Sequence, residues 1–451
     1  MKKFLALVLL VVGSLTATAQ IARPKLVVGL VVDQMRWDYL YYYYDKYGTD
    51  GLRRLVDQGY SFENTMINYV PTVTAIGHSS IYTGSVPALT GIAGNHFFEN
   101  GELKYCVGDP TVKSVGSNNS AGQMSPRNMW ASTLGDELRI ATDFKSKVIG
   151  VALKDRAAIL PAGHCADGAY WWDTKAGHFV TSTFYRDALP DWVVAFNKKY
   201  KQKPGTEMKL LDLGVTLTFK MAEAALENEQ LGQDDVTDLL AISISSTDAI
   251  GHKYSTRGPE NESVYMQLDR DLAAFFKVLD EKVGKGNYLL FLTADHGGAH
   301  NPNFMKQHRL PAGGFECWTI GGKDLNTYLQ QVYGTTAKLV TGSNSFRIYF
   351  NHKAIAEAGL NLQEGKDKAS AWFLQRPEVM YVADQANIAS QTIPQPIKER
   401  IINGWNAKRS GDLFIVTAPG WLDATDAPDY KGTGHSQWNP YDAHIPFVLY
   451  G

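Results

Sequence analysis

Three aspartates, each close behind an apolar run, are the first residues in this chain whose spacing indicates chemistry: Asp33, Asp248 and Asp295. If the three runs are parallel strands, their carboxyl ends meet at one edge of a sheet, where open α/β sheets bind ligands. Three carboxylates at one place repel one another unless cations compensate their charge. The pattern therefore predicts a metal site.

Two histidines accompany these acids. His252 lies four residues after Asp248, and His296 directly follows Asp295. Mixed aspartate and histidine ligands suit zinc, which binds oxygen and nitrogen donors at about 2.0–2.2 Å. A single Asp-His pair behind a strand is more often an ordinary capping or loop pair, so the prediction of zinc depends on the convergence of the three acids.

The stretch NYVPTVTAIGHSS, residues 68–80, contains a candidate nucleophile. Thr74 stands where a short helix over 75–82 can begin, and a hydroxyl at that position is commonly only a helix cap. The functional alternative is that Thr74 coordinates a metal, loses its proton and attacks a substrate, while the helix N-terminus binds an anion. Thr72 fits the cap as well, and spacing alone does not separate the two threonines.

Two cations in the stretch LKDR, Lys154 and Arg156, follow another apolar run. Residues two apart in an extended segment point to the same side. A phosphoryl group with two negative charges fits such a pair, because arginine can bind two of its oxygens. Without the metal site, exposed loop cations are the simpler interpretation.

The elements that must position these residues follow an α/β pattern, which predicts a mostly parallel central sheet flanked by helices. Strands are expected at 25–32, 147–153, 238–244 and 287–293, and helices at 52–57, 130–141 and 262–283. Two stretches, about 97–127 and 301–409, fit the sheet poorly, and we expect them to be insertions over its carboxyl end. The strand-like ending HIPFVLYG indicates a truncated sequence.

The formal net charge of −2 over 451 residues gives no general attraction to nucleic acid or to an anionic membrane. Residues 1–19 have a positive start, a short apolar run and small residues before Gln20, as signal peptides do. We expect cleavage before Gln20 and a periplasmic or secreted catalytic domain over 20–451. Stable membrane insertion is not expected, because the run is too short to span roughly 30 Å of bilayer. At most one disulfide can form among the three cysteines, Cys106, Cys165 and Cys317.

Eight segments together resemble the alkaline phosphatase superfamily, and within it the PafA-type phosphate-irrepressible monoesterases. They are VVDQMRWDYL, PTVTAIGHSS, GIAGNHFF, MSPRNMWASTLGDELR, LKDRAAILPAGH, STDAIGHKY, LTADHGG and GTGHSQWNPYDAHIP. The segments span nearly the whole chain after the signal peptide. So many matching segments in the same order do not arise by chance.

The resemblance implies two zinc ions and a full set of ligands. One zinc would be bound by Asp248, His252 and His435, and the other by Asp33, Asp295, His296 and the oxygen of Thr74. The resemblance thereby selects Thr74 over Thr72 and adds His435, which spacing does not reveal. The implied contacts of the phosphoryl group are Asn95, Lys154 and Arg156.

The implied activity is zinc-dependent hydrolysis of small-molecule phosphate monoesters through a phosphothreonine at Thr74, with release of inorganic phosphate. The alternative is a phosphodiesterase or nucleotide pyrophosphatase on the same fold with the same metals. A diester carries less negative charge and an extra substituent, so Lys154 and Arg156 together favour the monoester. A sulfatase is disfavoured because TAIGH lacks that motif's Cys or Ser, Pro and Arg. A binding protein that kept the fold would not need the hydroxyl. The natural substrate and the oligomeric state stay open.

Overall fold

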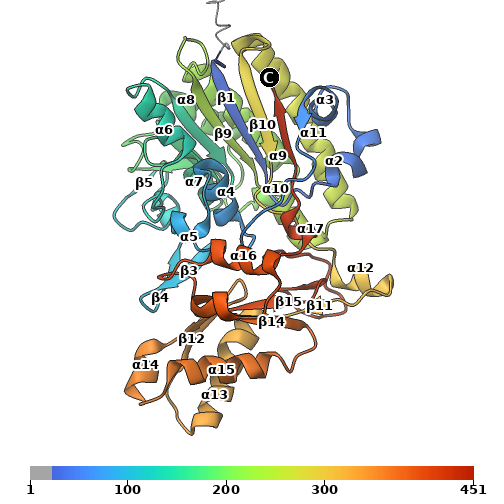
Figure 1. Cartoon of the computed structure of the whole chain (residues 1–451). Coiled ribbons are helices and arrows are strands. Elements are labelled where there is room, and N and C mark those ends of the chain that lie inside the picture. Colours follow the sequence, from blue (N-terminus) through green and yellow to red (C-terminus); the bar gives the residue numbers. More distant parts are fainter. Residues whose placement is uncertain (1–22) are drawn as a thin grey trace, which may run out of the picture.

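The computed structural model describes residues 23–451, so the predicted signal peptide lies outside the described residues. Figure 1 shows two parts, a large domain around a long central sheet and a small domain beneath it. Within the described chain, no helix combines the length and hydrophobicity that crossing a membrane requires.

The large domain is built on a nine-stranded sheet with the order β2-β17-β10-β1-β9-β6-β7-β8-β5. Its central strands are parallel: β10 (Tyr288–Thr293), β1 (Leu26–Val32), β9 (Asp238–Ile244), β6 (Val148–Ala152) and β7 (Gly168–Asp173). The strands at both edges are antiparallel: β2 (Tyr60–Ser61), β17 (Phe447–Tyr450), β8 (His178–Ser182) and β5 (Ser114–Val115). The predicted α/β fold with a mostly parallel sheet is confirmed, and the strands expected from the sequence are β1, β6, β9 and β10.

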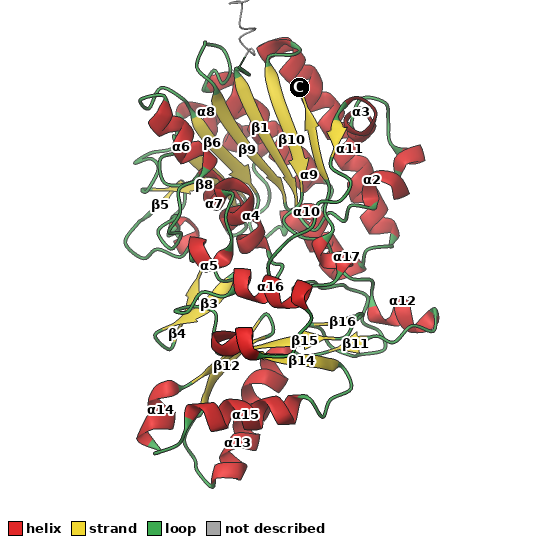
Figure 2. Ribbon diagram, viewed as in Figure 1, coloured by secondary structure: helices red, strands yellow, loops and turns green. Residues whose placement is uncertain are grey.

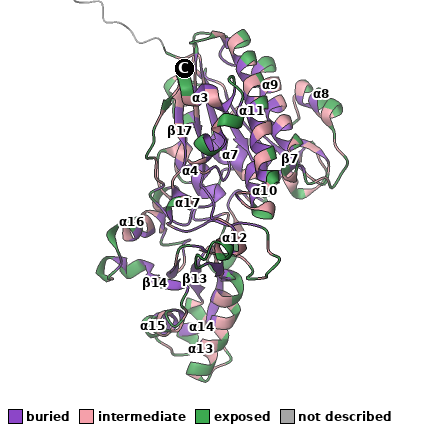
Figure 3. Cartoon of the chain, turned by 90° about the vertical axis from the view of Figure 1, so that its right-hand side faces the viewer, coloured by how far each residue is buried: buried purple, intermediate pink, exposed green. Residues whose placement is uncertain are grey.

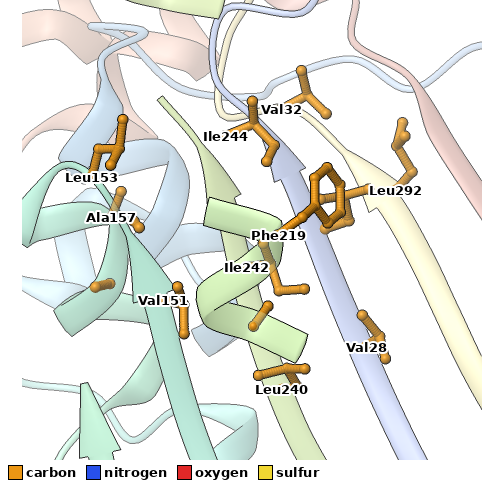
Figure 4. Packing of buried hydrophobic residues seen from close by; sticks show 14 of the residues in the cluster. Val28, Val32, Val151, Leu153, Ala157, Phe219, Leu240, Ile242, Ile244 and Leu292 are labelled. Atoms are coloured by element: carbon orange, nitrogen blue, oxygen red, sulfur yellow. The ribbon is translucent and has the colours of Figure 1, made fainter. Parts of the chain in front are cut away.

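Helices cover both faces of this sheet (Figure 2), which explains why its central strands are apolar at successive positions. On one face, Ile242 of β9 shares a buried cluster with Phe219 (Figure 4). On the other face, Val31 of β1 shares a second buried cluster with Tyr82. The helices that cover or adjoin the sheet include α3 (Leu52–Gln58), α4 (Thr74–Thr83), α6 (Leu134–Ala141), α7 (Asp155–Ala162), α9 (Leu213–Asn228), α10 (Ser246–Tyr254) and α11 (Pro259–Leu279).

Two of the expected helices have different starts in the structure. Helix α6 begins at Leu134 rather than at residue 130, because Thr133 and Asp136 form a reciprocal capping box at its N-terminus. Helix α11 begins earlier than expected, with Pro259 in its first turn. Proline suits that position because the backbone N–H that it lacks has no partner within the helix there.

The register of the central strands brings their ends to one level. Val31 of β1 lies opposite Thr293 of β10, and Val32 lies opposite Ile244 of β9. The segments that follow these three strands therefore leave the sheet at the same edge. This register positions the acids of the candidate site.

The small domain, residues 313–422, has its own sheet and its own hydrophobic core. Its antiparallel strands lie in the order β12 (Val340–Asn344), β13 (Arg347–Phe350), β15 (Leu413–Thr417) and β14 (Val379–Asp384). Its main helices are α13 (Leu325–Tyr333), α14 (His352–Glu357), α15 (Leu362–Phe373) and α16 (Gln395–Gly404). Buried residues concentrate in the sheets of both domains (Figure 3). Most of the stretch 301–409 thus forms a folded unit, which strand β15 completes.

The stretch 97–127 begins with a hairpin that reaches the small domain (Figure 1). Its strands are β3 (His96–Glu99) and β4 (Glu102–Tyr105). The rings of Phe98 and Tyr349 lie 4.9 Å apart between the hairpin and β13. The two stretches that fit the sheet pattern poorly therefore contact each other.

All three cysteines lie within the described part of the chain, and all are free thiols. Cys106 and Cys317 are buried, whereas Cys165 is partly exposed. Burial raises the pKa of the Cys106 thiol to about 12. The structure therefore pairs none of the three cysteines.

Candidate active site

Thr74, the predicted nucleophile, is the first residue of α4 and is buried. One turn later, His78 contacts the Thr74 carbonyl through Nδ1 at 2.9 Å and Ser243 Oγ through Nε2 at 2.8 Å. Ser243 belongs to β9, so His78 fixes the start of α4 at the edge of the sheet. His78 lies in the stretch 68–80, but its residue type and spacing do not indicate this role.

Thr72 does not cap this helix. The N-cap residue is Val73, which forms no side-chain cap within the described structure. The Thr72 hydroxyl instead accepts the Ser436 N–H and donates to the Gln437 carbonyl, each at 3.1 Å. The alternative in which Thr72 is the cap is therefore wrong, because its hydroxyl holds the segment that follows His435.

A first group of ligand atoms comes from α10 and the segment near residue 435. Asp248 and His252 are one helical turn apart and lie on the same face of α10. His252 Nε2 lies 3.1 Å from Asp248 Oδ1 and 3.1 Å from His435 Nε2. The structure thus brings together the three residues implied for the first zinc, and their ligand atoms lie within 4.8 Å of one another.

A second group lies at the ends of β1 and β10. His296 Nε2 lies 3.7 Å from Asp33 Oδ1 and 3.5 Å from Asp295 Oδ2. All three atoms are buried, and among the described residues Asp33 Oδ1 and His296 Nε2 have no hydrogen-bond partner, whereas Asp295 Oδ2 has only a marginal contact with His78 Nδ1 at 3.3 Å. Buried polar atoms are nearly always paired, so these donors fit a shared cation. Asp248 borders this group too, because its ligand atom lies within 4.8 Å of those of Asp33 and His296.

Gln34 orients the carboxylates of both groups. Its backbone N–H donates to Asp295 Oδ1 at 3.1 Å, and its Nε2 donates to Asp248 Oδ1 at 2.8 Å. Its φ of 64° is in the left-handed region that non-glycine residues rarely adopt. Residue type and spacing do not indicate this role, since a glutamine after a strand is ordinary.

Lys154 lies between the two groups. Its Nζ is 2.6 Å from Asp33 Oδ2 and 2.5 Å from Asp248 Oδ2. The ammonium thus contacts carboxylates of both groups in this structure. The phosphoryl contact expected for Lys154 stays a prediction.

Arg156 and Asn95 both contact the first turn of α4. Arg156 Nη2 lies 3.5 Å from Thr74 Oγ1, and its Nη1 donates to the Tyr105 hydroxyl at 3.2 Å. Asn95 Oδ1 accepts the Ala75 N–H at 2.9 Å. This bond directs the oxygen of the Asn95 amide to the helix, and the Nδ2 group is the donor that can reach a ligand beside Thr74.

Burial and neighbouring charges shift the pKa values of the ligands in opposite directions. Burial, with Asp248 nearby, raises the pKa of Asp33 well above its ordinary value. Burial also acts to raise the pKa of Asp248, but His252 and Lys154 hold it well below the ordinary value. Burial lowers the pKa of His435 well below that of free histidine. His435 is therefore neutral at physiological pH, and the neutral ring is the form that binds metals.

A sequence model of the type I phosphodiesterase / nucleotide pyrophosphatase family matches residues 27–439. The chain belongs to this family. It is 45% identical to alkaline phosphatase PafA of Elizabethkingia meningoseptica over 100% of this chain and 91% of the relative. It is 43% identical to alkaline phosphatase PhoV of Synechococcus elongatus over 96% of this chain and 86% of that protein. The resemblance to PafA-type enzymes is confirmed.

Solved structures of PafA have the same fold as this member of the family. The wild-type crystal structure matches with a TM-score of 0.90 and 44% identity, and the match covers 96% of this chain and 91% of that chain. A second structure with the same match is a variant in which a threonine is replaced by serine, and an asparagine, a lysine and an arginine by alanine.

Proposed function

We propose that this protein is an alkaline phosphatase that hydrolyses phosphate monoesters and releases inorganic phosphate. The observation that carries this proposal is the meeting of two groups of metal-ligand atoms at one sheet edge, where Thr74 and Arg156 also lie. The names of PafA and PhoV, both alkaline phosphatases, support the same activity.

The two groups of donors fit two zinc ions. Asp248, His252 and His435 would hold one ion, and Asp33, Asp295, His296 and the Thr74 oxygen would hold the other. Nitrogen and carboxylate oxygen are suitable zinc ligands, and the unpaired buried atoms of the second group need a cation. When bound, two zinc ions stabilise negative charge on both the attacking and the leaving oxygen.

Thr74 is the proposed nucleophile. Its hydroxyl loses its proton to solvent, Oγ1 attacks phosphorus in line with the ester oxygen, and the bond to the leaving alcohol breaks. The product on the protein is a phosphothreonine. Water then attacks phosphorus from the opposite side, the bond to Oγ1 breaks, and inorganic phosphate leaves. A phosphoryl group on Thr74 would lie at the N-terminus of α4, where the helix dipole favours negative charge.

Cations and an amide hold the equatorial oxygens of the phosphoryl group. Arg156 and Asn95 flank Thr74, and such groups stabilise the charge of a loose transition state. The Lys154 ammonium contacts two carboxylates in this structure, and its third N–H can donate to a phosphoryl oxygen. The four residue types replaced together in the PafA variant are the types we propose for these roles.

The alternative is a phosphodiesterase or nucleotide pyrophosphatase, the activity after which the family is named. A diester phosphoryl group has one negative charge and a second substituent in the place of an oxygen. The partly buried guanidinium of Arg156 beside Thr74 suits a charged phosphoryl oxygen better than a bulky substituent. Monoesters are therefore the preferred substrate in this proposal.

The deciding experiment compares p-nitrophenyl phosphate with bis-p-nitrophenyl phosphate on purified, zinc-loaded protein. We expect a higher kcat/KM for the monoester and release of inorganic phosphate. A higher kcat/KM for the diester would establish the alternative. Hydrolysis of neither ester by protein with two zinc ions per chain would overturn the proposal.

The proposed location is the periplasm or the exterior of the cell, after cleavage of residues 1–19 before Gln20. The sequence of the N-terminus is the basis for this expectation. N-terminal sequencing of the exported protein tests it, because a mature chain that begins at Met1 contradicts it.

A further inference from the structure

Side chains of the small domain bind several backbone carbonyls in the stretch that carries Asn95. We name residues 91–99 the Asn95 segment. Three of its backbone carbonyls, two before Asn95 and one after it, accept hydrogen bonds from that domain. The pairs of donor and acceptor are Arg409 and Gly91, Arg347 and Ala93, and Asn344 and His96.

Arg409 joins the two ends of the Asn95 segment. Its Nη1 donates to the Gly91 carbonyl at 2.7 Å, and its Nε donates to Glu99 Oε1 at 2.7 Å. The guanidinium is buried and lies 4.1 Å from the centre of the Trp130 ring. An arginine with this many partners has little conformational freedom, so it can fix the length and direction of the segment.

Arg347 links the Asn95 segment to the loop before Thr74. Its side chain is 1% exposed, and it donates to the carbonyls of Ala93 and, at 3.3 Å, Val70. Burial lowers its pKa to about 10, so it stays charged at neutral pH. A buried charge bonded to carbonyls rather than to a carboxylate is expensive, and an apolar side chain would fill the same space at lower cost.

We propose that Arg347, Arg409 and Asn344 are positioning residues through which the small domain fixes Asn95 beside Thr74. This inference rests on the proposed contact of Asn95 with the phosphoryl group. The large domain holds Asn95 itself through the N–H groups of Ala75 and Cys106, at 2.9 and 3.0 Å, and the small domain holds the carbonyls on both sides of it. Loss of the small-domain contacts would let those neighbouring peptides shift and change the direction of the Asn95 side chain. A displacement of about 1 Å in a group that orients the substrate can reduce the rate by about 100-fold.

The test measures kcat and KM for a monoester with Arg409→Lys and Asn344→Ala, each alone and combined with Asn95→Ala. Each single variant should lower kcat/KM, by about tenfold for Arg409→Lys, and should weaken inhibition by inorganic phosphate. In the Asn95→Ala protein the same substitutions should have almost no further effect, because the residue that they position is already absent. Arg347→Lys should keep part of its effect there, because it also holds the loop before Thr74.

A matched control separates positioning from loss of stability. Lys366 Nζ lies 2.7 Å from Asp384 Oδ2, and this buried pair lies within the small domain, away from the Asn95 segment. Lys366→Met should lower the melting temperature without changing kcat/KM or phosphate inhibition. Asn344 lies at the end of β12, so its replacement by Ala should keep the protein folded even if Arg409→Lys does not.

The outcomes are distinct. Non-additive losses with Asn95→Ala, together with an unchanged kcat/KM for Lys366→Met, support the inference. Full additivity, or an unchanged kcat/KM in Asn344→Ala and in folded Arg409→Lys, overturns it and leaves the proposed function intact. If Asn95→Ala alone has no effect on monoester hydrolysis, the proposed role of Asn95 is wrong, and the inference is overturned with it.

Discussion

The Nε2 atoms of His252 and His435 face each other at 3.1 Å, although the two residues are 183 positions apart in the sequence. The Nδ1 atoms of the same rings lie 2.9 Å and 2.5 Å from the carbonyls of Thr433 and Thr72. A carbonyl only accepts hydrogen bonds, so each Nδ1 carries a proton, and in a neutral ring each Nε2 then presents a lone pair. Two lone pairs at this distance repel unless a metal ion or a proton lies between them. Positive charge is favoured here, because burial acts to lower the pKa of His252 but Asp248 raises it above its ordinary value.

Removal of metal should therefore inactivate the protein and also destabilise it. A chelator followed by dialysis should abolish monoester hydrolysis and lower the melting temperature, and added zinc should restore both. Metal held at 100 times its Kd stabilises a folded protein by about 2.7 kcal/mol per site. Activity and calorimetry are measured beside elemental analysis. Full activity in protein shown to be free of metal would contradict both proposed sites.

Replacement of the nucleophile should separate chemistry from metal binding. Thr74→Ala should lower kcat by a factor on the order of 10⁴ or more and prevent a phosphoenzyme, while the metal content changes little, because the carboxylate and histidine ligands remain. Mass spectrometry after an acid quench measures the phosphoenzyme. Thr83→Ala, at the other end of α4, is the control and should retain activity. A phosphorylated residue other than Thr74 in the wild type would refute its role.

Sequence reasoning predicted the parts of the fold that local pattern determines. The runs that became β1, β6, β9 and β10 are apolar because both faces of each strand are covered, and this property is visible in the sequence itself. Asp33, Asp248 and Asp295 could be assigned to one edge because parallel strands place their carboxyl ends together.

The features of the candidate site that could not be predicted depend on contacts between residues far apart in the chain. His435 lies in a segment without periodic pattern, and only a resemblance to a family identified it. Gln34 donates hydrogen bonds to two carboxylates because its backbone is in the left-handed region. Its residue type does not indicate that conformation. The contact of Lys154 with Asp33 and Asp248 likewise depends on three separate strand ends meeting.

Charge at the phosphoryl site should determine the preference for monoesters. Replacing both Lys154 and Arg156 with Ala should lower kcat/KM for a monoester far more than for a diester, because the diester has one negative charge fewer. The loss for the monoester should be about 100-fold or more, as for other groups that stabilise transition-state charge. Lys353→Ala is the control, because Lys353 is an exposed lysine on α14 of the small domain. Equal losses on the two esters would remove the basis for the preference.

The ion pair between His164 and Asp136 should make the stability of the large domain depend on pH. His164 Nδ1 lies 3.2 Å from Asp136 Oδ2, and this hydrogen bond raises the pKa of His164. Because the pKa of His164 is higher in the folded than in the unfolded state, the ion pair stabilises the folded state fully below the unfolded pKa of about 6.5. This stabilisation is lost as the pH rises through the pKa of the folded state. The free energy of unfolding should therefore differ more between wild type and His164→Gln at pH 5.5 than at pH 9, as measured by urea titration. His308→Gln, which replaces an exposed histidine, should show no such difference, and a larger gap at pH 9 than at pH 5.5 for His164→Gln would contradict the assigned sign.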